Sequence, residues 1–465
     1  MSFTSRFVYL NPLRRSVFNV ASASKATQQK DIIINPTFEG IQLVSLPHLS
    51  SRLGLSRIAL VIKSGPKYES SKNRGISHLL RRSFGISTPD FTSVNLTRHF
   101  QQMGARVQCK TTREHTIYTV DIAPNFAVRA GHLLCCMAFS PCYYAWELQD
   151  IVYRLMRKDV DILNRQNLSG LNMELLHEAA FGTSDSGCGL GYSLIAPDDR
   201  VGSHSINQIK EYHSSRFTAG NCVLGIAHAD PNNDGMDILN KLKSVIHINP
   251  PLPEKRSAVN HGFIGGEVRR DLVAASTVYA YLAWPVNEYC PVNDLIVCAL
   301  NGSSNRIEYG GNACKSLLAR TAVEGDSETE ALAFHKSYSV HGLLGISVAG
   351  TCPEAVRARI KRIVSALRSE TLTEENLKQA KKILKADLMF RYEDPLHILV
   401  DISTNLLSSP DKCRKPTELV PDVDQINLST LNEAMKKIVN NQQVAFSLVG
   451  PNLGVIEPAQ VLLKV

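Results

Sequence analysis

The residues of this 465-residue chain that come closest to a catalytic pattern lie in one segment, RGISHLLRRSFG, from Arg74 to Gly85. Its apolar spacing predicts a helix over Gly75 to Phe84, on which positions 78 and 82 face the same side. Two histidines at that spacing could bind Zn²⁺, and a glutamate just before the second could activate water. Here the three positions hold His78, Arg81 and Arg82. Because arginine stays protonated and offers no lone pair, we expect neither zinc binding nor peptide-bond hydrolysis.

The remaining histidines and the cysteines show no metal-ligand spacing along the sequence. We interpret as structural the histidines that lack a second histidine or a carboxylate at metal spacing, such as His115, His177, His204 and His213. The 11 cysteines are scattered apart from the neighbours Cys135 and Cys136, and they include no C-x-x-C. We interpret them as buried thiols, consistent with a reducing compartment.

Two glycine-bearing segments resemble nucleotide loops only loosely. The stretch from Asn301 to Leu318 reaches Lys315, but Cys314 and Tyr309 stand where a P-loop requires glycines. We expect this stretch to be a loop that folds over the surface between two halves of the chain. The run from Gly187 to Gly191 lacks a third glycine in register, so we interpret it as a turn. Nucleotide binding is therefore not predicted.

Length and composition indicate a globular chain of more than one domain. Hydrophobic residues make up 44% and charged residues 20% of the sequence, which is globular usage. Because a single core stops growing at about 250 to 300 residues, we expect two domains. The apolar runs near Ile58 to Ile62 and Leu133 to Phe139 fall short of the roughly 20 residues that a membrane helix needs. We therefore expect no integral membrane segment.

Positive charge is concentrated at the N-terminus. The net charge is +8, and residues 1–30, which contain no acid, carry Arg6, Arg14, Arg15, Lys25 and Lys30. Without these cations the charge falls to +3, so we expect no basic face for nucleic acid. The Arg-bearing, Ser-rich, acid-free composition is typical of a mitochondrial transit peptide, with a disordered basic tail as the alternative.

The two halves of the chain repeat one order of elements. In each half a strand leads into a helix, a long helix follows, and a helix and a strand close the unit. An offset of roughly 220 residues is too long for a solenoid repeat and indicates a duplicated α+β domain. The repeated stretches are His115 to Phe139, Ala145 to Leu163 and Ser205 to His228 in the first half, and His341 to Leu367, Leu372 to Phe390 and Leu428 to Val449 in the second.

Composition also suggests where the chain divides. Prolines, glycines and charges collect between His247 and Gly266, as in an interdomain linker. We expect a transit peptide over residues 1–30, an N-terminal domain over 31–246, a linker over 247–265 and a C-terminal domain over 266–465. Further expected elements are strands at Ile41 to Leu46 and Ser56 to Lys63 and a helix at Asn95 to Met103.

The predicted helix at Arg74 to Gly85 resembles the zinc helix G-x-x-H-x-x-E-H of the pitrilysin-type, or inverzincin, peptidases. The stretch from Phe100 to Tyr118, FQQMGARVQCKTTREHTIY, resembles the Gly-Ala and Thr-Arg-Glu segments that follow in this family, which fixes the register. The family's distal glutamate, counted roughly 76 residues beyond Arg82, falls at Lys158 beside Asp159. One carboxylate does not restore the site. The resemblance implies an α+β fold of two tandem homologous pitrilysin-like domains, each a mostly antiparallel sheet with helices packed on it.

Within this family, the chain is most similar to the core proteins of mitochondrial ubiquinol-cytochrome c reductase, respiratory complex III. The similarity runs through WELQDIVYRLMRKD, LLHEAAFG (Leu175 to Gly182), GGNACKSLL and QAKKILKADLM (Gln379 to Met389). It implies an inactive, structural subunit, peripheral on the matrix side of the inner membrane, with no catalytic, cofactor-binding or metal residues and no cofactor. The implied partners are the first core protein, cytochrome b, cytochrome c one and the Rieske subunit, in a complex that is dimeric.

Two further expectations follow from the resemblance. A domain pair that closes on extended peptides in the peptidases leaves a cavity in which a presequence peptide could be held by β-augmentation. The alternative function is the noncatalytic alpha-type subunit of the mitochondrial processing peptidase, which also lacks zinc ligands. Its long glycine-rich loop is missing from the stretch between Asn301 and Leu318, which counts against this alternative.

Overall fold

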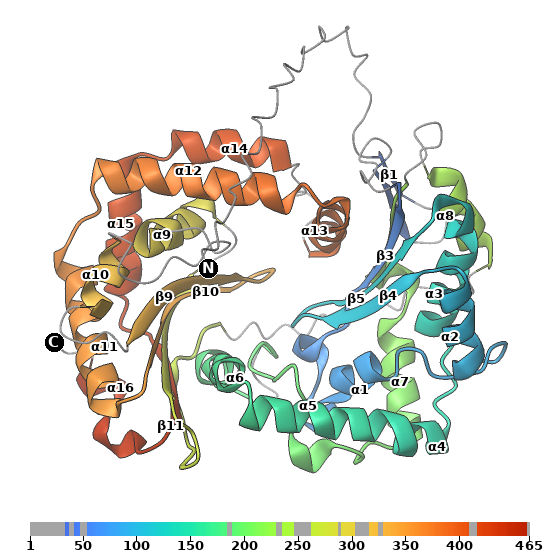
Figure 1. Ribbon diagram of the computed structural model, residues 1–465, viewed down its shortest axis with the longest axis horizontal. Helices are drawn as coiled ribbons and strands as arrows, with labels where there is room; N and C mark the ends of the chain where they lie inside the picture. Colours follow the sequence, from blue (N-terminus) through green and yellow to red (C-terminus); the bar gives the residue numbers. More distant parts are fainter. Residues whose placement is uncertain are drawn as a thin grey trace, which may run out of the picture.

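A computed structural model describes residues 33–36, 41–46, 54–183, 188–228, 235–245, 262–286, 290–302, 316–323, 329–408 and 416–462. The expected leader, most of the expected linker and most of the stretch from Asn301 to Leu318 lie outside these residues. The described part of the chain includes no helix long and apolar enough to cross a membrane. Two halves, each built on one sheet, face each other across the molecule (Figure 1).

The first sheet has the order β1-β2-β6-β3-β5-β4. Strands β2 and β6 are parallel and the other neighbouring pairs are antiparallel. Strand β3 is almost continuously apolar and buried, as expected for a central strand that is covered on both faces. The strands are β1 (Ile33–Pro36), β2 (Gln42–Ser45), β3 (Ser56–Ile62), β4 (Arg106–Thr111), β5 (Thr116–Ile122) and β6 (Cys222–Ala227).

The second sheet repeats this topology. Its order is β7-β11-β8-β10-β9, with β7 and β11 parallel and the other pairs antiparallel. The order and directions match β2-β6-β3-β5-β4 strand for strand. The predicted repeat and the predicted fold class, two tandem pitrilysin-like domains with mostly antiparallel sheets, are therefore confirmed. The strands are β7 (Gly266–Asp271), β8 (Val278–Val286), β9 (Glu330–Ser337), β10 (Gly342–Gly350) and β11 (Ala445–Gly450).

Helices cover both sheets (Figure 1). A five-residue π-helical segment, Leu148–Val152, joins α4 to α5 and makes them one continuous helix. The helices predicted from apolar spacing are all present within about two residues of their expected bounds. They are α1 (Ile76–Arg82), α2 (Ser93–Gln102), α3 (Ala127–Phe139), α4 (Ala145–Glu147), α5 (Tyr153–Arg165), α6 (Leu168–Phe181), α7 (Ile206–Arg216), α8 (Met236–Val245), α9 (Pro291–Asn301), α10 (Leu317–Val323), α11 (Pro353–Ser369), α12 (Glu374–Arg391), α13 (Pro395–Ser408), α14 (Pro416–Gln425), α15 (Leu428–Val439) and α16 (Ala459–Leu462).

Each half lends one helix to the other half's sheet. Helix α13 packs on β2, β3 and β6 of the first sheet, and α6 packs on β7, β8 and β11 of the second. Leu399 and Ile402 of α13 are buried against Val44, Ala59 and Val223. The matching cluster joins Leu176, Ala180 and Phe181 of α6 with Tyr281, Ala283, Leu343 and Ala445. The apolar face that each sheet turns toward the middle of the molecule is therefore covered by the opposite half.

Hydrogen bonds also join the halves. The Ser169 hydroxyl lies 2.6 Å from the Tyr281 hydroxyl. Lys67 donates from Nζ to Glu114 and to the Ser339 hydroxyl, each at 2.7 Å, and the backbone N–H of Ser339 donates to the same carboxylate at 3.0 Å. These bonds are partly buried, so they fix the relative position of the two sheets more firmly than exposed polar contacts would.

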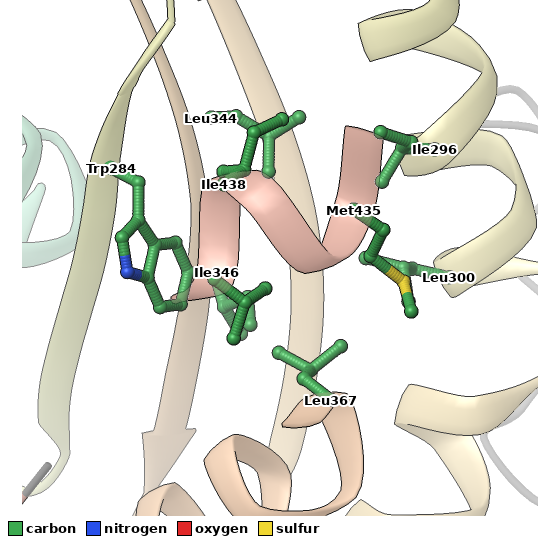
Figure 2. A pocket seen from close by; sticks show the side chains of 9 residues that line it. Trp284, Ile296, Leu300, Leu344, Ile346, Leu367, Met435 and Ile438 are labelled. Atoms are coloured by element: carbon green, nitrogen blue, oxygen red, sulfur yellow. The ribbon is translucent and has the colours of Figure 1, made fainter. Parts of the chain in front are cut away.

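The core of the second half contains a small apolar void between β8, β10 and helices α9, α11 and α15 (Figure 2). The atoms that line it are apolar. A ligand pocket needs several convergent polar groups to orient its ligand, so this void is a packing feature and not a binding site. It is lined by Trp284, Ile296, Leu300, Leu344, Ile346, Leu367, Met435, Ile438 and Val439.

The exchanged helix α13 gives the first prediction. Leu399 is fully buried and its Cδ1 lies 2.6 Å from where a Cβ on Gly225 of β6 would stand. We expect Leu399→Ala to lower the free energy of unfolding by about 2 to 5 kcal/mol. Hydrogen exchange should show the lost protection in β3 and β6 of the first half, although position 399 lies in the second. Asn405→Ala, at an exposed position of the same helix, serves as the control and should change stability by less than about 0.5 kcal/mol. Lost protection confined to the second sheet would contradict the exchange.

Candidate functional site

Helix α1 carries the predicted site residues, and its N-terminus is fixed by two features. Glu69 is buried, and its carboxylate accepts hydrogen bonds from the backbone N–H groups of Gly75, at 2.7 Å, and Ser77, at 2.8 Å. Gly75 has φ +87°, and a Cβ there would lie 2.5 Å from the Cβ of Ala196. A left-handed conformation in so tight a space admits only glycine. The first turn of α1 is therefore held against the segment around position 196.

His78 lies on the buried side of α1 and is only 1% exposed. Its Nδ1 accepts a hydrogen bond from the backbone N–H of Ala196 at 3.1 Å. In the neutral ring the proton therefore sits on Nε2, which donates to Oδ2 of Asp159 at 2.8 Å. Burial is the main cause that lowers the pKa of His78, so the neutral ring predominates at pH 7. Both ring nitrogens are engaged, and neither presents a lone pair to a metal ion.

Arg81 and Arg82 converge on the same carboxylate of helix α5. Arg81 donates from Nη2 to Oδ2 of Asp159 at 3.1 Å, and Arg82 donates from Nε to Oδ2 at 2.6 Å. Nη2 of Arg82 also bonds to Oδ1 of Asp159, which makes the pair bidentate. Both arginines therefore form ion pairs with Asp159. Lys158, which stands at the position counted for the family's distal glutamate, is exposed.

The electrostatics of Asp159 decide what this site can do. Burial raises the pKa of Asp159, but the hydrogen bonds from His78 and Arg82 and the charge of Arg82 outweigh it and hold the pKa well below its usual range. A carboxylate this acidic is a poor general base at neutral pH. Its oxygens already accept from three side chains, and two guanidinium groups occupy the space around it.

The residues present do not fit a zinc ion. Zinc requires three or four ligands with free lone pairs, whereas His78 and Asp159 are fully engaged and both arginines are cations. Among the residues that the structure describes, no group of three or more His, Cys, Asp and Glu side chains could hold a metal. The network of His78, Arg81, Arg82 and Asp159 instead joins α1 to α5 through charge-assisted hydrogen bonds.

The other histidines singled out in the sequence do not gather at this site. His115, His177, His204 and His213 are all buried. Nδ1 of His177 lies 2.7 Å from the Met173 carbonyl and its Nε2 lies 2.6 Å from the Tyr338 hydroxyl across the two halves. His213 donates from Nε2 to the Ala138 carbonyl at 2.8 Å. The contacts of His177 and His213 are internal to the fold, as expected of structural histidines.

The prediction that the cysteines are buried thiols is only partly right. Cys135 and Cys222 are buried, but Cys290 and Cys352 are exposed. Both exposed cysteines directly precede a proline that starts a helix, so they occupy N-cap positions at the surface. Cys109, Cys136, Cys142, Cys188 and Cys298 are half-buried, and all nine described cysteines are free thiols.

The two glycine-bearing segments are described only in part. Residues 188–191 form a turn, as expected, in which Gly189 has φ +71° and packs on the backbone of Lys67. Of the stretch from Asn301 to Leu318, residues 303–315 lie outside the described part of the chain. The described Ser316 accepts a hydrogen bond from the backbone N–H of Ala319 at 3.1 Å and so caps α10.

Removing the carboxylate tests the network. We expect Asp159→Ala to lower the free energy of unfolding by about 3 to 5 kcal/mol, because His78 and two arginines lose their shared acceptor. Chemical denaturation with far-UV circular dichroism measures the change. Asp161→Ala on the same helix removes an exposed pair with Arg165 at 3.7 Å and should cost less than about 1 kcal/mol. If both substitutions lowered the free energy of unfolding equally, the network would not contribute to stability.

The two carboxyl groups that hold α1 give opposite pH dependences. Because the pKa of Asp159 is lowered, its contribution is present above about pH 4 and is lost as pH falls further. Burial raises the pKa of Glu69 to about 7, so its contribution is present below about pH 4.5 and is lost as pH rises through 7. We expect Glu69→Gln to abolish up to roughly 3 kcal/mol of the decline in stability between pH 4.5 and 7.5. Denaturation midpoints over pH 3 to 8 measure this. If the stability of the wild-type protein rose between pH 5 and 7 as steeply as that of Glu69→Gln, the raised pKa of Glu69 would be refuted.

Comparison with known proteins agrees with this geometry. Residues 51–187, which include α1 and α5, match the insulinase (peptidase family M16) model. The chain is 25% identical to mouse cytochrome b-c1 complex subunit 2 over 94% of both chains. It is 23% identical to potato mitochondrial-processing peptidase subunit alpha over 83% of this chain and 76% of that protein, and 24% identical to the human beta subunit over 86% and 81%. The predicted resemblance to the pitrilysin-type peptidases, and within them to subunit 2 of the cytochrome b-c1 complex, is thereby confirmed.

Proposed function

We propose that this chain is a noncatalytic, structural subunit of a mitochondrial cytochrome b-c1 complex. The observation that supports it best is that the carboxylate of Asp159 binds Arg81 and Arg82. These two arginines stand where the family's motif has its catalytic glutamate and its second histidine. The similarity to cytochrome b-c1 complex subunit 2 over almost the whole chain supports the same assignment. In this proposal the fold of a peptidase persists as a scaffold, and no residue of the chain is catalytic or binds a cofactor.

The proposal includes a place in the cell and a set of partners. The chain would lie peripherally on the matrix side of the inner membrane, with residues 1–30 as a transit peptide and domains at 31–246 and 266–465 joined by the linker 247–265. Its partners would be the first core protein, cytochrome b, cytochrome c one and the Rieske subunit within a dimeric complex. The absence of a membrane-crossing helix from the described residues is compatible with a peripheral position.

A presequence peptide is a further proposed partner. Strand β4 is the outermost strand of the first sheet, where it pairs with β5. Within the described residues, no strand pairs with its other edge. The backbone N–H and C=O groups of that edge can therefore accept an added strand, which is the requirement for β-augmentation.

The alternative function is the noncatalytic alpha-type subunit of the mitochondrial processing peptidase. Processing-peptidase subunits are also similar to this chain over more than four fifths of its length. The stretch from Asn301 to Leu318 lacks the long glycine run expected of that subunit. This difference favours the structural subunit.

Fractionation of detergent-solubilised inner membrane separates the two functions. We expect the chain to comigrate with cytochrome absorbance at unit stoichiometry, without stoichiometric zinc by atomic absorption. Mass spectrometry of the same fraction after denaturation tests for a bound presequence peptide. A chain that elutes as a soluble heterodimer with presequence-cleaving activity would support the processing peptidase instead. Stoichiometric zinc in the isolated chain, with proteolysis that a chelator abolishes, would overturn both noncatalytic assignments.

A further inference from the structure

The continuous helix α4–α5 and its N-cap residue expose several large apolar side chains. Trp146 is 58% exposed, Ile151 40%, and Leu155 and Ile162 37% each. The ring of Tyr144, which is 47% exposed, stacks on Trp146 with centroids 6.4 Å apart and planes 11° apart. Single exposed apolar residues are common on protein surfaces, but here five of them lie between positions 144 and 162 of the chain. We call these five residues the outer stripe.

The outer stripe is a property of a firmly held helix. Ile151, Leu155 and Ile162 follow a spacing of four and seven residues, which keeps them on one side of α5. An adjacent side of the helix buries Val152, Met156 and Val160, and the first two belong to the core of the first half. Asp159 lies between the two sides and is fixed by its bonds to α1. The helix cannot rotate to hide the stripe without breaking that network.

Cations without partners border the outer stripe. Arg154, Arg157 and Lys158 are exposed and form no ion pair with any residue in the described ranges. Asp150, one turn before Arg154, is an exposed acid on this helix. The exposed carboxylate of Asp161 pairs with Arg165 on the same helix, and that of Asp159 is engaged with α1. The surface therefore combines apolar contact area with an excess of positive charge.

We propose that the outer stripe and its bordering cations dock an acidic, amphipathic segment of a neighbouring subunit. Aromatic residues and arginine are the residue types that carry binding energy at protein interfaces. Unpaired cations on the rim select an acidic partner and disfavour a basic one. The inference rests on the proposed function, since it assumes that the chain works inside an assembly.

Two other occupants fit the surface less well. An interfacial membrane helix buries its apolar face about 5 to 10 Å deep, whereas each residue of the outer stripe is already about half covered by its own molecule. The chain itself offers no suitable segment outside the described residues. Its acidic stretches of five or more residues there, 229–234 (ADPNND) and 324–328 (EGDSE), contain no large apolar residue, and residues 1–30 are basic.

Site-specific photo-crosslinking in the assembled complex tests the proposal. The full chain is expressed in mitochondria with Leu155 replaced by p-benzoylphenylalanine, and the same replacement at Val273, 91% exposed in the second half, serves as the control. Co-purification with cytochrome absorbance tests the proposed function independently. We expect the crosslink from position 155 to map to one acidic segment of another subunit, with a yield well above that from position 273.

Charge reversal provides the second readout. Arg154→Glu, Arg157→Glu and Lys158→Glu combined should lower the crosslink yield from position 155 at least about five-fold. The matched control reverses Lys382, Lys436 and Lys437, exposed cations on α12 and α15, and should leave the yield unchanged.

Crosslinks to lipid, to a basic segment or to none above the control would overturn the proposal, as would a yield that charge reversal leaves intact. If the chain purifies as a soluble heterodimer, the proposed function fails. The crosslink is then mapped on that partner, where an acidic segment upholds the docking surface and any other result overturns it.

Discussion

The carboxylate of Asp159 holds together the part of the molecule in which a peptidase would place its metal. It accepts hydrogen bonds from His78, Arg81 and Arg82 and thereby ties helix α1 to helix α5. In a zinc site a dication would perform this cross-link, and its ligands would keep an open position for water. Here the cations are guanidinium groups of the chain itself, and no open position is left. The guanidinium groups thus join the same two helices, and they leave no position at which a metal ion could bind.

The network also sets limits on its surroundings. His78 can donate to Asp159 only because its Nδ1 is occupied by the backbone N–H of Ala196, which selects the tautomer. Ala196 in turn approaches so closely that position 75 admits only glycine. Glu69 completes the arrangement by accepting from the first N–H groups of α1. A buried polar group without a hydrogen-bond partner would destabilise the fold. Because these groups satisfy one another, they hold α1 in a single position.

Much of this could be predicted from the sequence, and the exceptions have physical reasons. The spacing of His78, Arg81 and Arg82 revealed the degenerate helix, but counting along the family pattern fell on Lys158, one residue before Asp159, and did not predict the role of that carboxylate. The repeat of strands and helices predicted two sheets of one topology. Ala196 was not identified because it contributes a backbone N–H, which no side-chain pattern reports. The exchange of α6 and α13 was missed because periodicity shows that a helix has an apolar face but not which sheet covers it. The continuous apolar run of β3 did carry part of that signal, since it requires cover on both faces. The exposure of Cys290 and Cys352 was missed because composition says little about a cap position.

The exchange of helices has a consequence for how the chain reaches its native state. A polypeptide is synthesised from its N-terminus. The face of the first sheet that includes Val44 and Ala59 therefore stays exposed to solvent until α13, which ends at Ser408, has been made. The N-terminal unit cannot finish folding as an independent domain, even though its sheet is complete once β6 has formed. Contacts so distant in sequence form slowly, and until they form, folding intermediates expose apolar surface that favours aggregation. A nascent or truncated chain that stops before residue 395 would therefore depend on chaperones to remain soluble.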